Sequence, residues 1–266
     1  MTELLHKELT SAIIGAYYEV YNHTSRNYPE YIYERAMIQE LQQRGYPATQ
    51  QDEYRIIYKE HLVGIQRLDL FVVQEVVVEN KVAEQLTALH KAQGLSYLKT
   101  VGKTIGLLFN FGNKDPEFDR LYFDPARRKP ASPDGLHSIG TPSADWLYPD
   151  LTYSIVGSLY EVHNVLGPGF VHRIYANACH QELRLRGLAS KPVKRMQVAY
   201  KDSVVGDIAF DHLVVEGKVV VFPVALCDIQ AVRLDSMKDW LRRCCVRLGI
   251  VVNFDALRLQ TAFVRA

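Results

Sequence analysis

Three ionisable residues lie close together in the first half of this 266-residue sequence. Asp69 lies in one apolar run, and Glu79 and Lys81 lie two positions apart in the next. Residues two apart on a β-strand point to the same face. Two opposed carboxylates repel each other and lose hydration unless a cation lies between them. Mg²⁺ or Mn²⁺ would suit these oxygen ligands, and the neighbouring lysine could orient or deprotonate a water or stabilise a phosphate.

The loop between the two runs decides whether the carboxylates meet. A three-residue loop over residues 73–75 pairs Val72 with Val76. Asp69 then lies directly opposite Glu79, and opposed residues share a face of the sheet. A two-residue loop would place the carboxylates on opposite faces.

A matching segment in the second half of the chain favours the three-residue loop. It reads Val215-Glu216-Gly217, with glycine where a left-handed residue is needed. The first copy would then hold Glu75 in an unfavourable left-handed conformation. The alternative is that the three charges form an ordinary solvated face.

A helix that follows the strands carries two more polar candidates. We expect it to run from a cap at Thr87 to about Lys99. Gln93 and Tyr97 are spaced i, i+4 and therefore share one face of this helix. Both side chains can hydrogen-bond a phosphate or an active-site lysine, although a core tyrosine beside a surface glutamine would have the same spacing.

The second half of the sequence repeats the first. Leu9 and Leu151 are 142 positions apart, and this separation holds without a gap as far as Asp69 and Asp211. Matching segments include Tyr18-Glu19-Val20 with Tyr160-Glu161-Val162, Arg44-Gly45 with Arg186-Gly187, and Tyr58-Lys59 with Tyr200-Lys201. One inserted residue then brings Asn110-Phe111 onto Asn253-Phe254. The chain therefore contains two tandem copies of one fold.

Hydrophobic periodicity predicts the same element order in each copy. In the first copy we expect helices over 4–22 and 30–44, strands over 54–58, 67–73 and 76–82, the helix described above, and a strand over 105–111. This order indicates an α/β fold with a mixed central sheet flanked by helices. The predicted domains are residues 1–123 and 146–266. A linker rich in Pro, Gly, Ser and Asp joins them at 124–145.

Bulk composition excludes several classes of protein. The formal net charge is +1, so nucleic acid would have to bind a local groove and not a general positive field. We find no signal peptide and no apolar run long enough to span a membrane. The four cysteines, all in the second half, show no zinc-type spacing, and we expect reduced thiols in a cytoplasmic protein.

The pattern D…ExK on adjacent strands, followed by QxxxY on a helix, resembles the PD-(D/E)XK nuclease superfamily, particularly its RecB-like and lambda-exonuclease-like branch. Segments such as YEVHNVLGPGF, ELRLRG and GLLFNFG are more specifically similar to the GxxExxY family within it. The resemblance covers nearly all of each copy. It implies two restriction-endonuclease-like units and a metal-dependent nuclease.

The resemblance also implies roles for individual residues of the first copy. Asp69 and Glu79 match the metal ligands, Lys81 matches the catalytic lysine, and Gln93 and Tyr97 match the substrate-binding helix pair. Glu30 matches the motif glutamate that approaches the metal from a helix. Glu19 is a rival for this role, but it recurs as Glu161, which suits a structural role. Asn27 stands where the motif has glycine.

The second copy has lost these residues. By sequence register Asp211 falls on Asp69, but the other positions are replaced: Glu79 by Val221, Lys81 by Pro223, Glu30 by His172, Gln93 by Ser236 and Tyr97 by Trp240. We predict a pseudo-enzyme domain that serves packing, positioning or binding. A separate metal site at His172 and Asp211 would lack a visible third ligand.

The sequence thus predicts a Mg²⁺- or Mn²⁺-dependent nuclease that cleaves DNA, or RNA, in its first domain. The alternative is a non-catalytic nucleic-acid-binding or assembly module built on a nuclease fold. Metal-assisted hydrolysis of another substrate has no positive support. We expect the two copies to pack as an intramolecular pseudo-dimer.

Overall fold

The protein consists of two compact units. The computed structural model describes residues 6–124, 146–201, 203–226, 229, 232 and 234–266. One unit contains residues 1–56 and 65–125, and the other contains 57–64 and 126–266. The predicted linker at 124–145 lies, apart from Asp124, outside the described residues. Cys227 also lies outside them, and Cys179, Cys244 and Cys245 are free thiols.

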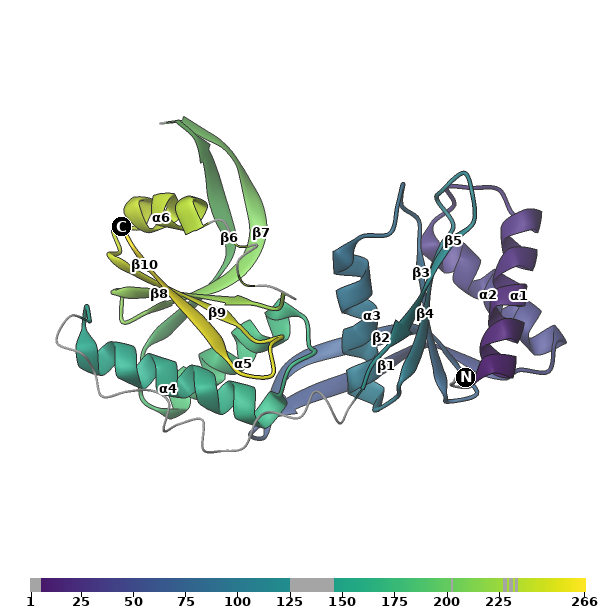
Figure 1. The fold of residues 1–266 in the computed structure, drawn as a ribbon, viewed down its shortest axis with the longest axis horizontal. Coiled ribbons are helices and arrows are strands. Elements are labelled where there is room, and N and C mark those ends of the chain that lie inside the picture. The colour runs from purple at the N-terminus through teal and green to yellow at the C-terminus, as the bar shows by residue number, and fades with distance from the viewer. Residues whose placement is uncertain (1–5, 125–145, 202, 227–228, 230–231, 233) are drawn as a thin grey trace. The chain divides into compact units, whose positions relative to one another are not determined.

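The first unit is a five-stranded mixed sheet with helices on both faces (Figure 1). Its elements are α1 (Lys7–His23), α2 (Glu30–Gln43), β1 (Ala48–Tyr58), β2 (His61–Val72), β3 (Val76–Lys81), α3 (Ala88–Val101), β4 (Ile105–Asn110) and β5 (Glu117–Tyr122). The strands lie in the order β1-β2-β3-β4-β5. Strand β3 is antiparallel to β2 and parallel to β4. The predicted fold class is confirmed.

Alternating side chains of β3 build two separate cores. Val76 and Val78 pack against Tyr17 and Met37 of the first two helices. Val77 faces the other way and packs in the cluster that contains α3. By the same alternation Glu79 lies on the α3 face. A carboxylate is therefore held in a layer of otherwise apolar side chains.

The predicted hairpin register is confirmed. Val72 pairs with Val76 and Leu70 with Val78, so the next pair along the ladder sets Asp69 opposite Glu79. The left-handed residues differ from those expected: Val73 has φ 53° and Gln74 has φ 54°, and Glu75 is not among them. The loop has the predicted length of three, but its first two residues and not its third are left-handed. The expected loop Val215-Glu216-Gly217 of the second copy was wrong: Val215 pairs with Val219, so the loop is 216–218 and Gly217 is its second residue.

Two strands are longer than predicted, and a third was not predicted. Strands β1 and β2 are longer than predicted and form a continuous hairpin that turns through the left-handed residues Lys59 and Glu60. Strand β5, which pairs with β4 at the edge of the sheet, was not predicted. Its charged segment EFDRLY is largely half-buried and shows little hydrophobic alternation. Thr87 caps α3 as predicted, accepting a bond from the His90 backbone.

The second unit repeats this architecture. Its elements are α4 (Pro149–Leu166), α5 (His172–Leu185), β6 (Ser190–Tyr200), β7 (Ser203–Val215), β8 (Val219–Val224), α6 (Leu234–Arg243), β9 (Leu248–Asn253) and β10 (Gln260–Arg265). The strand order is β10-β9-β8-β7-β6, again with one parallel pair, β8 with β9. In Figure 1, α6 covers one face of this sheet and α4 and α5 the other.

The inserted residue of the second copy lies earlier than the sequence register suggested. Val215 pairs with Val219, so Val215 matches Val72 and the separation of the copies is already 143 at this hairpin. A register shift between Val193 and Arg195 marks the place, because two residues of β7 oppose one of β6 there. Asp211 lies in this bulge.

This finding corrects the sequence comparison of the two copies. Leu70 and Leu213 are both the third pair from their hairpins, so His212 and not Asp211 takes the place of Asp69. Counting forward from Val219, Phe222 replaces Glu79, Pro223 replaces Asn80 and Val224 replaces Lys81. The prediction that the second copy lacks the acids and the lysine survives, but with different residues.

Asn110 and Asn253 are kept in both copies for a structural reason. The Asn110 amide donates to Ala83 O at 2.9 Å and to Glu117 at 2.8 Å. The Asn253 amide donates to Leu226 O at 2.9 Å and to the Gln260 side chain at 3.0 Å. Both side chains are fully buried. Each asparagine therefore closes the loop behind the parallel strand pair.

No helix in the part of the chain that the structure describes has the length and apolar content that a membrane crossing requires.

Candidate active site

Strands β2 and β3 bring the first carboxylate into the interior. Asp69 is 9% exposed, and its Oδ2 accepts a hydrogen bond of 2.8 Å from the backbone N–H of Asn80. Burial raises the pKa of Asp69 to about 6, although this backbone bond acts in the opposite direction. The strand pairing thus holds an acid whose ionised form needs a positive partner.

The second carboxylate is buried more completely. Glu79 is 1% exposed, and its Oε1 accepts a hydrogen bond of 2.6 Å from Lys81 Nζ. Its Oε2 has no hydrogen-bond partner among the described residues. Burial, followed by repulsion from Asp69, raises the pKa of Glu79 to about 8. Both effects penalise the charged carboxylate, so a cation at this point would be strongly favoured.

Lys81 completes the group of three. Burial by itself lowers the pKa of Lys81, but its ion pair and hydrogen bond with Glu79 outweigh burial, and the pKa is raised. The ammonium is therefore protonated at neutral pH. It also lies 3.9 Å from Oε2 of Glu30. The structure thus brings all four predicted charged residues into one neighbourhood.

Glu30 lies beside the site, whereas its rival Glu19 does not. Glu30 begins α2, is half-exposed, and its Oε1 lies 3.4 Å from the backbone N–H of Val82. Glu19 is half-exposed on α1 and pairs with His23 of the same helix, at 3.3 Å. Of the two glutamates, Glu30 is the one that lies near Lys81.

The predicted helix pair joins the same site. Gln93 Nε2 donates to the Tyr97 hydroxyl at 2.7 Å. Burial, followed by the Glu79 charge, raises the pKa of Tyr97 to about 12. The phenol is therefore a neutral hydrogen-bonding group that lies on the α3 side of the carboxylates.

Sequence reasoning missed a further carboxylate. Glu34 lies one turn after Glu30 on α2, is 4% exposed, and accepts bonds from Gln50 and Gln51 at 2.9 and 2.7 Å. Its charge contributes to the raised pKa of Asp69. The signal was present, because an i, i+4 spacing places Glu34 on the same helix face as Glu30.

The donor set fits a hard divalent cation with open coordination. Within the described residues, no three His, Cys, Asp or Glu side chains form a ready-made metal cluster. Mg²⁺, however, needs only one or two protein carboxylates, because waters and substrate phosphates fill its other positions. Asp69 and the unpartnered Oε2 of Glu79 supply two such oxygens. The buried, mutually repelling pair is the observation that supports the fit.

The corresponding region of the second unit is filled by aromatic rings. The Trp240 indole N–H donates to His212 Nε2 at 3.0 Å, and His212 stacks on Phe222 with ring centroids 5.6 Å apart. Burial lowers the pKa of His212, so its ring is neutral and accepts this bond. Trp240 therefore packs against the core of the second unit.

The second-unit pair considered as a metal site stays incomplete. His172 Nε2 lies 3.7 Å from Asp211 Oδ2. Burial lowers the pKa of His172, although the Asp211 charge acts against this. No third ligand joins the pair among the described residues.

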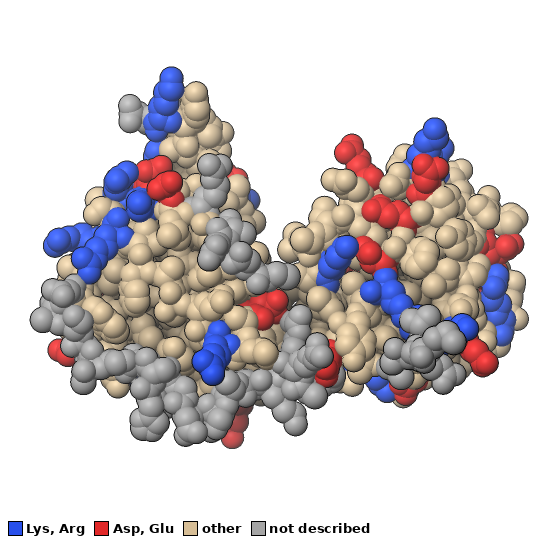
Figure 2. All heavy atoms as spheres, in the orientation of Figure 1, with Lys and Arg blue, Asp and Glu red and all other residues tan. Residues whose placement is uncertain are grey.

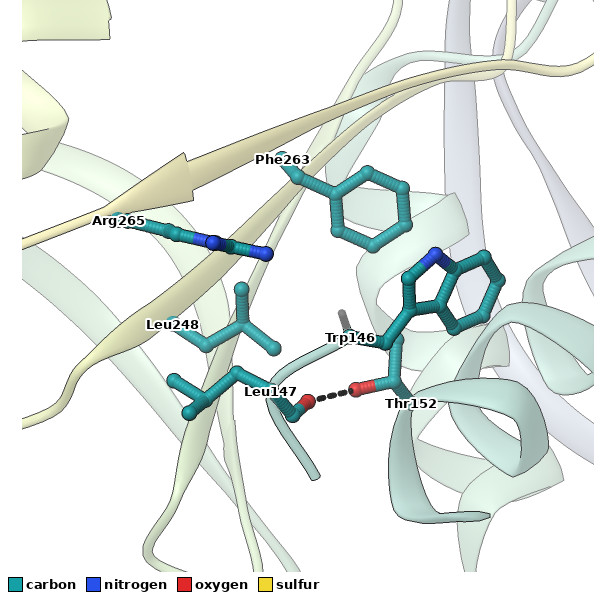
Figure 3. Close-up of a pocket in the computed structure, with 6 residues that line it drawn as sticks. All are labelled: Trp146, Leu147, Thr152, Leu248, Phe263 and Arg265. Atoms are coloured by element: carbon teal, nitrogen blue, oxygen red, sulfur yellow. Dashed lines mark hydrogen bonds between the residues drawn. The ribbon is translucent and has the colours of Figure 1, made fainter. Parts of the chain in front are cut away.

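A cavity of about 110 Å³ in the second unit has a different character. Its lining residues are Trp146, Leu147, Thr152, Leu248, Phe263 and Arg265 (Figure 3). The rings of Trp146 and Phe263 lie 5.6 Å apart, and the Thr152 hydroxyl donates to Leu147 O at 2.8 Å. None of the lining residues carries a carboxylate, so the cavity offers no cation site of the predicted kind.

Surface charge is of mixed sign (Figure 2). On the face drawn in Figure 2, basic and acidic side chains are interspersed among uncharged residues. On α6, Lys238 and Arg242 each pair with an aspartate one turn earlier, at 3.4 and 3.0 Å. These basic groups are thus partly neutralised in place.

A mixed sheet flanked by helices, with opposed carboxylates and a lysine at its centre, defines the first unit as a nuclease-type α/β fold, and the second unit as the same fold without those groups. The chain belongs to the PD-(D/E)XK nuclease superfamily, whose family model matches residues 7–121 and 149–266. The two matched segments agree with the duplication. No curated protein matches the sequence. A solved structure described as "Crystal structure of SSO0001" is similar at 13% identity, covering 45% of this chain and 80% of that chain, with a TM-score of 0.24.

Proposed function

We propose that the protein is a divalent-metal-dependent nuclease that hydrolyses phosphodiester bonds in DNA, or in RNA, with its chemistry in the first unit. The observation that carries this proposal is the buried pair Asp69 and Glu79, with one carboxylate oxygen unpartnered and Lys81 beside it. A buried charge pair of this kind is unfavourable for the fold by itself and is typical of functional sites.

Asp69 and Glu79 would hold Mg²⁺ or Mn²⁺, with Glu30 near enough to assist. When bound, the cation supplies Lewis-acid activation of the phosphodiester. Strand pairing positions the two carboxylates, so their separation does not depend on a flexible loop. The bond from Asn80 N–H fixes one oxygen of Asp69, and the other oxygen would serve as the ligand.

Lys81 would act as a charged hydrogen-bond donor. Because its pKa is raised, it holds its proton at neutral pH, which favours stabilisation of a phosphate over removal of a proton from water. Gln93 and Tyr97 already hydrogen-bond each other and could place the substrate strand by donating to its phosphates.

Within the superfamily we assign the chain to the GxxExxY type. Glu30 lies three residues before Tyr33 on α2, as that motif requires, and it reaches Lys81. Tyr33 is buried, and its hydroxyl donates to Ser25 O at 2.7 Å, so it anchors the turn that leads into the helix. We further propose that residues 1–123 form the catalytic domain and 146–266 an inactive one.

The test is cleavage of single- and double-stranded DNA and RNA by the purified protein with Mg²⁺ or Mn²⁺. We expect Asp69→Ala and Lys81→Ala each to lower the rate by about 10²–10³-fold or more, because the first removes a ligand of the cation and the second removes a positive charge aimed at the transition state. The matched control is Asp211→Ala, which alters the carboxylate that sequence register aligns with Asp69, and its activity should equal that of the wild type.

Equal activity in all three variants would point to a contaminating nuclease. No cleavage, together with no divalent-ion binding that depends on Asp69 and Glu79, would instead favour a non-catalytic binding or assembly module. The ion pair of Lys81 with Glu79 is the observation that favours this second candidate, because it satisfies part of the site without metal.

A further inference from the structure

Two glutamates of the second unit bind the tip of the β1–β2 hairpin. This unit includes residues 57–64, which are the end of β1, the two-residue turn and the start of β2. The Tyr58 hydroxyl donates to Glu182 Oε2 at 2.7 Å. Lys59 Nζ pairs with Glu161 Oε1 at 2.7 Å and with Glu182 Oε2 at 2.9 Å. A Tyr-Lys tip is thus recognised by one carboxylate from α4 and one from α5.

The guanidinium of Arg186 orients the receiving carboxylate of Glu182. We call the arrangement of Glu161, Glu182, Arg186 and Gly157 the receptor. Arg186 Nε donates to the other oxygen of Glu182 at 2.8 Å, and Nη2 donates to Gly157 O at 3.3 Å. A Cβ at Gly157 would lie 3.1 Å from Arg186 Nη1. The glycine therefore leaves space for the arginine that orients the receiving carboxylate.

The first unit contains the same receptor. Arg44 Nε donates to Glu40 Oε1 at 2.6 Å, and Nη2 donates to Gly15 O at 3.4 Å. A Cβ at Gly15 would lie 2.9 Å from Arg44 Nη1. Glu40 and Glu19 both line a hollow of about 200 Å³ between α1 and α2. The frame is thus repeated residue for residue, with Glu19 in the place of Glu161.

The second unit in turn carries a hairpin tip of the same kind. Tyr200 and Lys201 take the places of Tyr58 and Lys59, and in both tips the lysine lies over the tyrosine ring, at 5.5 and 5.6 Å. Tyr58 is 0% exposed whereas Tyr200 is 66% exposed. The apolar Val205 is also exposed, whereas its counterpart in the first hairpin is buried. The β1–β2 tip is therefore buried at its tyrosine, whereas the matching β6–β7 tip is exposed to solvent.

We propose that the β6–β7 hairpin tip of one chain docks into the α1–α2 groove of a second copy of this chain. Tyr200 would donate to Glu40, and Lys201 would pair with Glu19 and Glu40. Charge complementarity and the repeated receptor frame select this occupant. Each chain offers one tip and one groove, so the contact is heterologous and either closes by reciprocal exchange or continues head to tail.

Sedimentation velocity over a wide concentration range tests the proposal on the full chain. We expect reversible self-association of the wild type, weakened about tenfold or more in Lys201→Glu and in Glu19→Lys, because each places like charges in contact. Mixing these two single variants should restore association, because the unaltered tip of Glu19→Lys then meets the unaltered groove of Lys201→Glu in one heterologous contact. Lys191→Glu, an exposed charge reversal on β6, is the matched control and should associate as the wild type does.

Amide hydrogen exchange supplies a second measurement. Association should protect α1, α2 and the β6–β7 turn together, and both variants should lose this protection. A monomeric wild type at every concentration would overturn the proposal. So would association that survives both charge reversals, or protection of the groove that does not depend on concentration, since the tip would then dock within its own chain.

Discussion

The pair of acids at the centre of the first unit has unusual protonation. Burial raises the pKa of Glu79 from 4.5 to about 8 and that of Asp69 from 3.8 to about 6. Protons therefore compete with any cation for these oxygens near neutral pH. Metal affinity is thus coupled to pH over a range in which ordinary carboxylates no longer titrate.

We expect the apparent affinity for Mn²⁺ to rise by about tenfold per pH unit where one proton is displaced, up to about pH 8. Calorimetry in buffers of different ionisation enthalpy would count the protons released. Glu79→Gln should remove the upper step, and Asp211→Asn should leave the profile unchanged. Affinity that is flat between pH 6 and pH 8 would contradict the assignment.

Stability of the metal-free protein should respond with the opposite sign. Between the usual pKa of 4.5 and the folded value of about 8, the folded protein binds more protons at Glu79 than the unfolded chain does. This contribution to stability is therefore present at low pH and is lost as the pH rises through about 8. A melting temperature that rises with pH across this window, without metal, would disagree.

Among the elements, the loop of the β2–β3 hairpin determines which side chains lie opposite each other at the site. Its length of three fixes the pairing of Val72 with Val76 and hence the meeting of the two acids. Left-handed backbone at Val73 and Gln74 is unfavourable for residues with a Cβ, and the second copy has Gly217 in such a position.

Gln74→Gly should stabilise the protein by about 1 kcal/mol, because glycine relieves the left-handed strain without changing a contact. The reciprocal change, Gly217→Gln, should destabilise it by a similar amount. Urea unfolding of both variants would check the two signs together. The same sign for both would show that turn strain is not the dominant effect.

The sequence predicted much of this unit because its signals were local. Helical periodicity, the cap at Thr87 and a loop of three residues led to the fold, the register and the Asp69–Glu79 pairing, although Gly217 is the second and not the third residue of its loop. It missed β5, whose charged residues lack alternation, and Glu34, whose burial depends on Gln50 and Gln51. The position of the insertion also failed, because matching Asp211 to Asp69 hid a bulge that only strand pairing reveals.

For the whole molecule, the two copies of one fold differ in what lies at their centre. The first unit keeps unfavourable buried charge at its centre, whereas the second has His212, Phe222 and Trp240 packed there. An aromatic core of this kind contributes stability without a cation.

We therefore expect one divalent cation per chain. Crystals soaked with Mn²⁺ should show a single strong anomalous peak beside Asp69 and Glu79, and Asp69→Ala should abolish it. His172→Ala, which alters the partner of Asp211, should leave the peak in place. A second peak at His172 and Asp211 would show that the second unit binds metal as well.

The bulge in β7 sets the terms for any attempt to rebuild catalysis in the second unit. A designer who relied on aligned letters would graft an acid at 221 and a lysine at 223, and both would project to the face opposite the vacated centre. The ladder directs the graft to 212, 222 and 224 instead. Because of this one extra residue, the substitutions that the alignment suggests would not place the acid and the lysine at the centre of the second unit.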